Sequence, residues 1–301
     1  MFEPGMSARA LQQRYKEYTK EMAITFPVLR RKLEGGLRIV TYNVHMEHNY
    51  FARSAYDEGG DRMTALVHQL DPDVICFQEV ESRPERLCPP PLCFSMFQQL
   101  FSGYGNGICS RFPIKDLLNV VYSAGRGTSE HRGLLGCTVC APNRPEIRVY
   151  TTHLDVYDES GRTRLRQVTE LHELISQDLA QLKFTGPVLL MGDFNAMHRP
   201  HYPHQANPAL SRSWEQIVQH DLTRGLQHET STMDYLLNLS HNRWWDVFGL
   251  QPPLVTSWAM RRIDFILIKA THLLLGKVEA WVAFDCASDH LPVVVDWSVE
   301  G

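Results

Sequence analysis

The chain has 301 residues, of which 44% are hydrophobic and 21% are charged, a composition typical of a globular protein with a sizeable core. Its formal net charge of −4 argues against a protein that coats polyanions over its whole surface, although it leaves room for a local basic groove. No run approaches the roughly 18 apolar residues of a membrane span, and the N-terminus lacks the apolar centre of a signal peptide. We therefore expect an intracellular monomer, in the cytoplasm or the nucleus, with no membrane span.

The first 36 residues predict a helical extension ahead of the main fold. The stretch MSARALQQRYKEYTKEMA mixes Glu with Lys and Arg, which favours a polar, solvated appendage over a transit peptide. Residues 37–301 are predicted to form one domain, because they contain no internal repeat and no linker that would divide them. Two irregular stretches, 84–93 and 197–227, are rich in proline or polar residues and are predicted as surface loops.

Strands and helices alternate along the main domain. Residues 37–44, LRIVTYNV, form a β-branched and aromatic run that suits a buried strand. Apolar residues at helical spacing predict one helix that ends before DPD and a second, longer helix over 165–182. Further strands are predicted at 74–77, 131–139, 146–154, 187–191, 261–268 and 291–297. This alternation indicates a mixed α/β domain with a large two-sheet core.

The seven cysteines are scattered and lack the paired spacing of a zinc site. Cys137 and Cys140 form a CxxC pattern, but they lie in a strand-like run, where residues three apart face opposite sides of a sheet. We therefore interpret the cysteines as reduced thiols.

Polar residues suited to a catalytic site lie at the ends of several predicted strands. Side chains at strand ends can converge on one rim of a core although they are far apart in sequence. Burying so many carboxylates, amides and imidazoles for structure alone would be costly, whereas a site for a hard divalent cation and a phosphate would use them all. These residues are Asn43, Glu79, His153, Asp193, Asn195, Asp264, Asp289 and His290.

Six short motifs carry a family resemblance. TYNVH, FQEV, THLD, GDFNA, RRIDFIL and SDHLPV occur in order between residues 37 and 297, and together they closely resemble the endonuclease/exonuclease/phosphatase superfamily. That superfamily includes pancreatic-type DNases, abasic-site endonucleases, tyrosyl-DNA phosphodiesterases, deadenylases, sphingomyelinases and inositol-phosphate phosphatases. The resemblance implies a DNase-like α/β fold: a four-layered sandwich of two packed, mixed β-sheets flanked by helices, with the site at one sheet edge.

The resemblance also implies a metal site. Glu79 matches the principal ligand, and Asn43 and Asp289 would assist it directly or through water. The expected ion is Mg²⁺ or Mn²⁺. A carboxylate-bound cation of this kind neutralises charge on the transition state of phosphoryl transfer and eases departure of the leaving oxygen.

The remaining motif residues are implied in catalysis. Asp193 and Asn195 would hold the attacking water and the scissile phosphate, and His153 would donate to a non-bridging phosphate oxygen. His290 would be the general base or a phosphate stabiliser, oriented by Asp264, because an imidazole paired with a carboxylate gains basicity and a fixed tautomer. Whether Asp193 or His290 takes the proton of the water stays open.

Three further residues are candidates for substrate contact. Glu130 in SEHRG lies where some DNase-like members carry a carboxylate that pairs with the TTH histidine, here His153, but the register is uncertain by one residue and a solvent-facing Glu fits equally well. Trp258 and Arg261 could stack on a base and contact phosphate, or belong to an ordinary strand start; both interpretations stay open.

Two local features qualify the resemblance. His198, His201 and His204 could capture zinc, but Pro200 and Pro203 break any helix that would align them, so we favour a polar loop near the substrate. Almost nothing intervenes between FQQLFSGY and GICSRFPI, where family members usually carry a longer stretch containing a strand. We therefore expect an edge strand to be missing or shortened.

The predicted function is Mg²⁺-dependent hydrolysis of a phosphodiester or phosphomonoester bond by in-line attack of water, on nucleic acid or a nucleic-acid adduct. The alternative is a phospholipid or sphingomyelin-type phosphodiesterase, which an exposed apolar hairpin would favour. A family member that binds but does not cut would be marked by a lost ligand, such as Glu79→Gln or His290→Tyr, and neither is lost. The physiological substrate and the choice between endo and exo cleavage stay open.

Overall fold

The computed structural model describes most of the chain. The described residues are 8–25, 30–47, 57–81, 84–88, 90–100, 104–125, 131–198, 230–238, 242–249, 255–258, 261–269, 276–285 and 287–298. Within these ranges, no helix is both long enough and apolar enough to cross a membrane.

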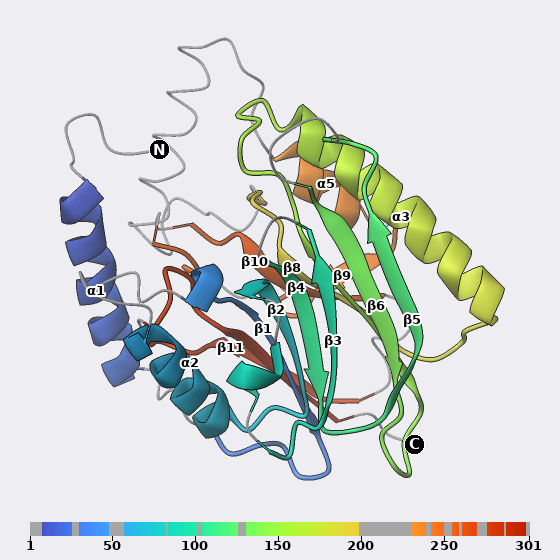
Figure 1. Cartoon of the computed structure of the whole chain (residues 1–301), viewed down its shortest axis with the longest axis horizontal. Coiled ribbons are helices and arrows are strands. Elements are labelled where there is room, and N and C mark those ends of the chain that lie inside the picture. Colours follow the sequence, from blue (N-terminus) through green and yellow to red (C-terminus); the bar gives the residue numbers. More distant parts are fainter. Residues whose placement is uncertain are drawn as a thin grey trace.

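Two six-stranded mixed sheets form the centre of the molecule (Figure 1). The first sheet has the order β11 (Val278–Val282), β12 (Val293–Trp297), β1 (Leu37–Asn43), β2 (Val74–Glu81), β4 (Tyr104–Ser110) and β3 (Phe94–Gln99). The second has the order β5 (Ile114–Val121), β6 (Gly133–Val139), β7 (Ile147–His153), β8 (Val188–Asp193), β10 (Asp264–Lys269) and β9 (Trp244–Asp246). The helical elements are α1 (Ala8–Thr25), η1 (His45–Glu47), α2 (Asp57–Leu70), η2 (Pro84–Leu87), α3 (Arg162–Leu182) and α5 (Ser231–Leu237).

Alternation along the strands produces the layers. On β1, Ile39 packs into the core between the two sheets, whereas its neighbour Val40 packs with residues of α2 on the outer face. On β8, Leu189 packs into the central core and Leu190 packs with residues of α3. These two strands are therefore buried on both faces, and the predicted four-layered sandwich, helix–sheet–sheet–helix, is confirmed.

Both sheets contain a parallel pair of strands joined through a helix. β1 runs parallel to β2 with α2 between them in sequence, and β7 runs parallel to β8 with α3 between them. The carboxyl ends of these four strands carry or directly precede the polar residues of the sequence motifs. Ligands bind beyond the carboxyl ends of parallel strands in open α/β sheets, so this rim is the natural position for a site.

The N-terminal helix α1 is not the solvated appendage that its composition predicts. Tyr15 is fully buried in the central core, and the ring of Tyr18 meets that of Phe284 edge-on, with 6.0 Å between centroids. Met22 also packs against this core. Tyr15, Tyr18 and Met22 recur at helical spacing, so a narrow apolar stripe on a mostly charged helix is sufficient to dock it.

The edge strand that was expected to be missing or shortened is present. β3 pairs with β4 along its whole length, from Phe94 opposite Ser110 to Gln99 opposite Gly105. The FQQ of FQQLFSGY is itself the end of this edge strand, so the strand lies earlier in the chain than expected. The six cysteines in the described ranges carry free thiols, as predicted.

A buried ion pair ties β1 to β12, and we expect Arg38→Met to lower the free energy of unfolding by about 3–5 kcal/mol. Arg38 bonds Asp296 through Nε and Nη2, at 2.8 and 2.9 Å, and both side chains are buried. The substitution leaves the carboxylate buried without its partner. Urea unfolding followed by circular dichroism measures the loss. Arg62→Met, which removes an exposed ion pair with Asp285, is the control and should change stability by no more than about 1 kcal/mol.

Candidate active site

Strand pairing aligns the site residues of the second sheet. His153 on β7 lies directly opposite Asp193 on β8, and Asp193 lies directly opposite Asp264 on β10. Gly192 permits this arrangement, because its φ is 142° and a Cβ there would lie 1.9 Å from the carbonyl oxygen of Thr152. The GDFNA motif therefore needs its glycine to bring the ends of β7 and β8 together.

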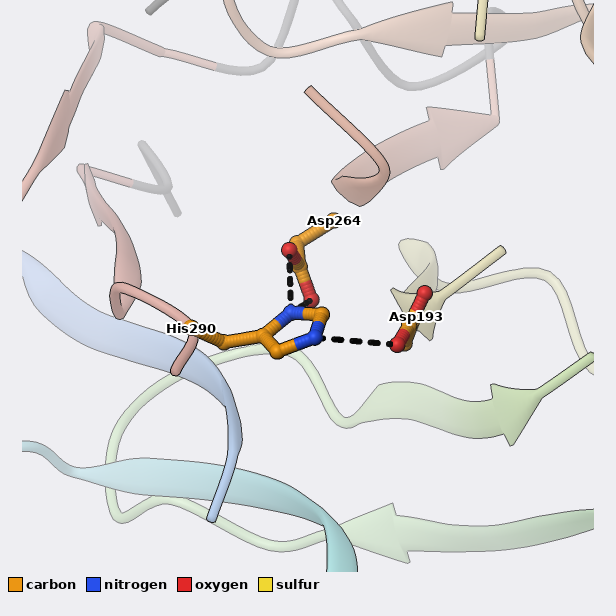
Figure 2. A group of neighbouring side chains, drawn as sticks. All are labelled: Asp193, Asp264 and His290. Carbon is orange, nitrogen blue, oxygen red and sulfur yellow. Dashed lines mark hydrogen bonds and ion pairs between the residues drawn. The ribbon is translucent and has the colours of Figure 1, made fainter. Parts of the chain in front are cut away.

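His290 lies between two aspartates (Figure 2). Its Nδ1 is 2.9 Å from Oδ2 and 3.1 Å from Oδ1 of Asp264, and its Nε2 is 3.7 Å from Oδ2 of Asp193. All three side chains are buried. The Asp264 carboxylate accepts the Nδ1–H, which fixes the ring orientation and directs Nε2 towards Asp193.

Asp193 and His290 hold protons more tightly in this cluster than they would in water. Burial raises the pKa of Asp193 to about 7, and repulsion from Asp264 adds to the effect. Burial alone would lower the pKa of His290, but the carboxylates of Asp264, Asp193 and Asp289 raise it well above its ordinary value. Asp193 is therefore suited to proton transfer near neutral pH, whereas the carboxylates around His290 favour its protonated form.

Two carboxylates from the first sheet face each other next to this cluster. Glu79 belongs to β2 and Asp289 to the segment before β12, and the ring of His45 lies between them. Its Nδ1 is 3.7 Å from Oε2 of Glu79 and 3.5 Å from Oδ2 of Asp289. Burial raises the pKa of Glu79, and the charge of Asp289 raises it further. A divalent cation would relieve this repulsion, and the oxygen donors suit a hard ion such as Mg²⁺.

Asn43 connects the two sheets. Its Nδ2 donates to Oε1 of Glu79 at 3.1 Å and to Oδ2 of Asp193 at 3.0 Å, while its Oδ1 accepts the backbone N–H of His45 at 3.0 Å. Because a backbone N–H can only donate, this contact settles which end of the amide is oxygen. Asn43 thus holds the predicted metal ligand Glu79 and the predicted catalytic Asp193 in one network.

Three site residues have left-handed backbones, which are costly for residues other than glycine. Their φ angles are 45° at His45, 54° at Glu79 and 46° at Asn195. Glu79 lies in a β-bulge between Phe77 and Val80, and such a bulge turns a side chain out of the regular strand pattern. Clustered backbone strain of about 1–3 kcal/mol per residue points to a functional constraint at this rim.

His153 is held by Arg132 and Asn195. Nη1 of Arg132 lies 3.0 Å from Nδ1 of His153, and Nδ2 of Asn195 lies 3.0 Å from Nε2. Burial, together with the charges of Arg132 and His290, holds the pKa of His153 well below its ordinary value. The backbone N–H of Asn195 donates to Oδ1 of Asp193 at 2.9 Å, so these two GDFNA residues orient each other.

The structure describes two of the three residues predicted to contact the substrate. Trp258 is half-buried, and its backbone N–H donates to the carbonyl oxygen of Asp289 at 2.7 Å, so it lies beside the site. Arg261 forms an isolated bridge with Ser257, which in turn bridges to His290. Glu130 lies outside the described residues.

Of the three histidines in the loop after β8, the structure describes only His198. His201 and His204 lie outside the described residues. His198 has its Nε2 3.5 Å from Oδ1 of Asp234, on α5. A zinc site at this loop stays an open hypothesis.

Sequence reasoning missed two residues of this site, His45 and Arg132. His45 belongs to the TYNVH motif, but its place between two carboxylates depends on the left-handed turn. Arg132 precedes β6, whose Gly133 lies opposite His153. Knowledge of the strand register would have identified Arg132 as a neighbour of His153.

Comparison with known proteins agrees with this geometry. The model of the Endonuclease/Exonuclease/phosphatase family matches residues 40–290. An endonuclease/exonuclease/phosphatase from Beutenbergia cavernae has 20% identity and a TM-score of 0.60, with 90% of this chain and 72% of that chain covered. The human Nocturnin catalytic domain with bound sulfate has 16% identity and a TM-score of 0.60, with 90% and 97% covered.

ANGEL2, a 2′,3′-cyclic phosphatase, has 17% identity and a TM-score of 0.59, with 88% of this chain and 96% of that chain covered. At these identities the solved structures show a shared fold. The comparison with curated proteins finds no match. The family match, however, spans most of the sequence and includes every residue of the site from Asn43 to His290. The chain therefore belongs to the endonuclease/exonuclease/phosphatase family.

Proposed function

We propose that this protein is a Mg²⁺- or Mn²⁺-dependent hydrolase that cleaves a phosphodiester or phosphomonoester bond in nucleic acid or a nucleic-acid adduct, by in-line attack of water. Family membership supports a phosphoester hydrolase. The observation that carries the proposal is the position of His290, bonded to Asp264 on one side and facing Asp193 on the other. This arrangement can take a proton from a water beside a phosphate.

One group of residues handles the proton of the attacking water, and a second group binds the phosphate. Asp264 fixes the His290 ring, so that Nε2 and the Asp193 carboxylate are both placed to accept the proton of the attacking water. His153 and Asn195 donate to a non-bridging oxygen of the phosphate, which holds the phosphorus in line with the water.

The Glu79 and Asp289 carboxylates are the proposed metal ligands, and Asn43 holds Glu79 in place. A bound Mg²⁺ would neutralise charge on the phosphate and stabilise the leaving oxygen. Asp193, Asp264 and His290 also offer ligand atoms within 4.8 Å of one another. We assign the ion to Glu79 and Asp289 because their donors are all oxygen, whereas the ring nitrogens of His290 are engaged by the two aspartates.

Two exposed apolar residues lie shortly after a site residue in the sequence. Val156 and Tyr157, which follow β7 and His153 by a few residues, are 49% and 59% exposed. Arg164 anchors the loop that carries Val156 and Tyr157, because it donates to the carbonyl oxygens of Asp155 and Asp158. Such a pair could contact a base of nucleic acid or the apolar part of a phospholipid, so both substrates belong in the test.

The test is a hydrolysis panel with Mg²⁺ or Mn²⁺. It contains single-stranded and duplex DNA, an abasic duplex, a 5′-tyrosyl oligonucleotide, poly(A) RNA and sphingomyelin vesicles. RNA ending in a 2′,3′-cyclic phosphate is added because ANGEL2 is a 2′,3′-cyclic phosphatase. We expect metal-dependent cleavage of a nucleic-acid member. Cleavage of sphingomyelin alone would support the phospholipid alternative. Metal binding without any cleavage would indicate a family member that binds but does not cut.

A further inference from the structure

Arg132 is a buried arginine whose position is set by strand pairing. It directly precedes Gly133, and β6 pairs with β7 so that Gly133 lies opposite His153. Arg132 is 4% exposed and His153 is 3% exposed. The 3.0 Å between Nη1 of Arg132 and Nδ1 of His153 is a hydrogen-bond distance. The guanidinium therefore approaches the edge of the ring that faces away from Asn195.

The chemistry of this contact decides where the ring carries its proton. A guanidinium has five N–H donors and no acceptor, and it stays charged in proteins. Nδ1 of His153 must therefore accept, which leaves the ring proton on Nε2. A carboxylate at the same place, as expected from Glu130, would accept a hydrogen bond from Nδ1–H, which leaves the lone pair on Nε2. We propose that Arg132 is a positioning residue that fixes His153 as the Nε2–H tautomer, so that the ring donates to the substrate phosphate.

The surroundings of Nε2 support this inference. Asn195 donates one N–H of Nδ2 to the carbonyl oxygen of Leu154 at 3.1 Å, and Nδ2 lies 3.0 Å from Nε2. With the ring proton on Nε2, these two nitrogens are both donors and cannot bond each other. Oδ2 of Asp193 and Oε1 of Glu79 are 3.6 and 3.8 Å from Nε2, beyond hydrogen-bond distance. Two donors thus converge on one point, where a single oxygen atom can accept from both. A non-bridging phosphate oxygen meets this requirement.

The inference rests on the proposed function, but its main test does not depend on turnover. The full-length protein is labelled with ¹⁵N-histidine, and long-range ¹H–¹⁵N correlations report the tautomer of His153, assigned by comparison with His153→Gln. We expect the Nε2–H tautomer in the wild type and a shift of the Nε2 resonance on adding inorganic phosphate. Arg132→Met removes the donor and should release the tautomer, whereas Arg132→Lys keeps a donor and should retain it.

Hydrolysis of bis-p-nitrophenyl phosphate gives the second measurement. Arg132→Met should lower kcat by about 10–100-fold, the usual cost of losing a group that orients a functional imidazole, with little change in KM. Arg132→Lys should recover most of this loss. Arg166→Met, which removes an exposed arginine on α3, should match the wild type.

The Nδ1–H tautomer in the wild type, or an unchanged tautomer in Arg132→Met, would overturn the inference. If Arg132→Met does not fold, the tautomer of His153 in the wild type and in Arg132→Lys decides whether the inference holds. If no phosphoester is hydrolysed, the proposed function fails, while the tautomer and the phosphate-dependent shift still decide the role of Arg132.

Discussion

We expect the His290→Ala variant to stay folded and to lose turnover by about 10²–10⁴-fold, the usual contribution of a positioned acid or base. The ring nitrogens of His290 face Asp264 and Asp193, so its removal takes away the imidazole between the two carboxylates and abolishes proton transfer through the ring. Steady-state kcat and kcat/KM on the panel member that is cleaved measure the loss. Thermal unfolding of the same preparation verifies the fold.

Two comparisons make this test specific to the site. His68→Ala removes an exposed histidine on α2 and should leave turnover unchanged. Asp264→Asn keeps the ring but withdraws the carboxylate that orients it, so it should lower turnover as well. Wild-type turnover in His290→Ala would refute the catalytic assignment, whereas an equal loss in His68→Ala would trace the effect to the fold.

The same cluster predicts a pH dependence. Asp193 and His290 must give up their protons before they can accept one, and both have raised pKa values, that of Asp193 being about 7. Turnover is therefore expected to rise with pH through this range. A bound cation favours the ionised carboxylate and the neutral imidazole, so Mg²⁺ should move the acid limb of the profile to lower pH.

The strands that the sequence predicts are those buried on both faces. β1, β8 and β12 consist of buried residues throughout, and their continuous apolar runs are visible in the sequence. The edge strands β3 and β5 are largely half-buried or exposed, so IKDLLNVV and FSMFQQ give no clear pattern. Their pairing depends on neighbouring strands, which no local pattern reports.

The site was predictable to the extent that its residues follow predictable strands. Asp193 and His153 end β8 and β7, so recognising the apolar runs was sufficient to place them. His45 was missed because its position depends on a left-handed turn of three residues that are not glycine. Arg132 was missed because its contact with His153 depends on the register of β6 against β7. A register shift of one residue would have turned its side chain to the opposite face of the sheet.

The metal assignment predicts that Glu79→Gln lowers Mn²⁺ affinity by about 100-fold or more, because even residues that only orient a ligand contribute about 10–100-fold. Glutamine keeps the shape of the side chain but withdraws the charge that faces Asp289. Electron paramagnetic resonance of free Mn²⁺ during titration measures the affinity without reference to turnover. Because the pKa of Glu79 is raised, protons compete with the ion, and wild-type affinity should fall as the pH is lowered from neutral.

Two further variants locate the ion. Glu85→Gln alters an exposed glutamate on η2, close in sequence to Glu79, and should bind Mn²⁺ like the wild type. Asp264→Asn changes the His290 cluster and should also retain Mn²⁺, although it loses turnover. If Asp264→Asn lost the ion and Glu79→Gln kept it, the metal would belong to Asp193, Asp264 and His290. Proton transfer would then fall to other groups, because an ion and a proton cannot share the same lone pair on His290.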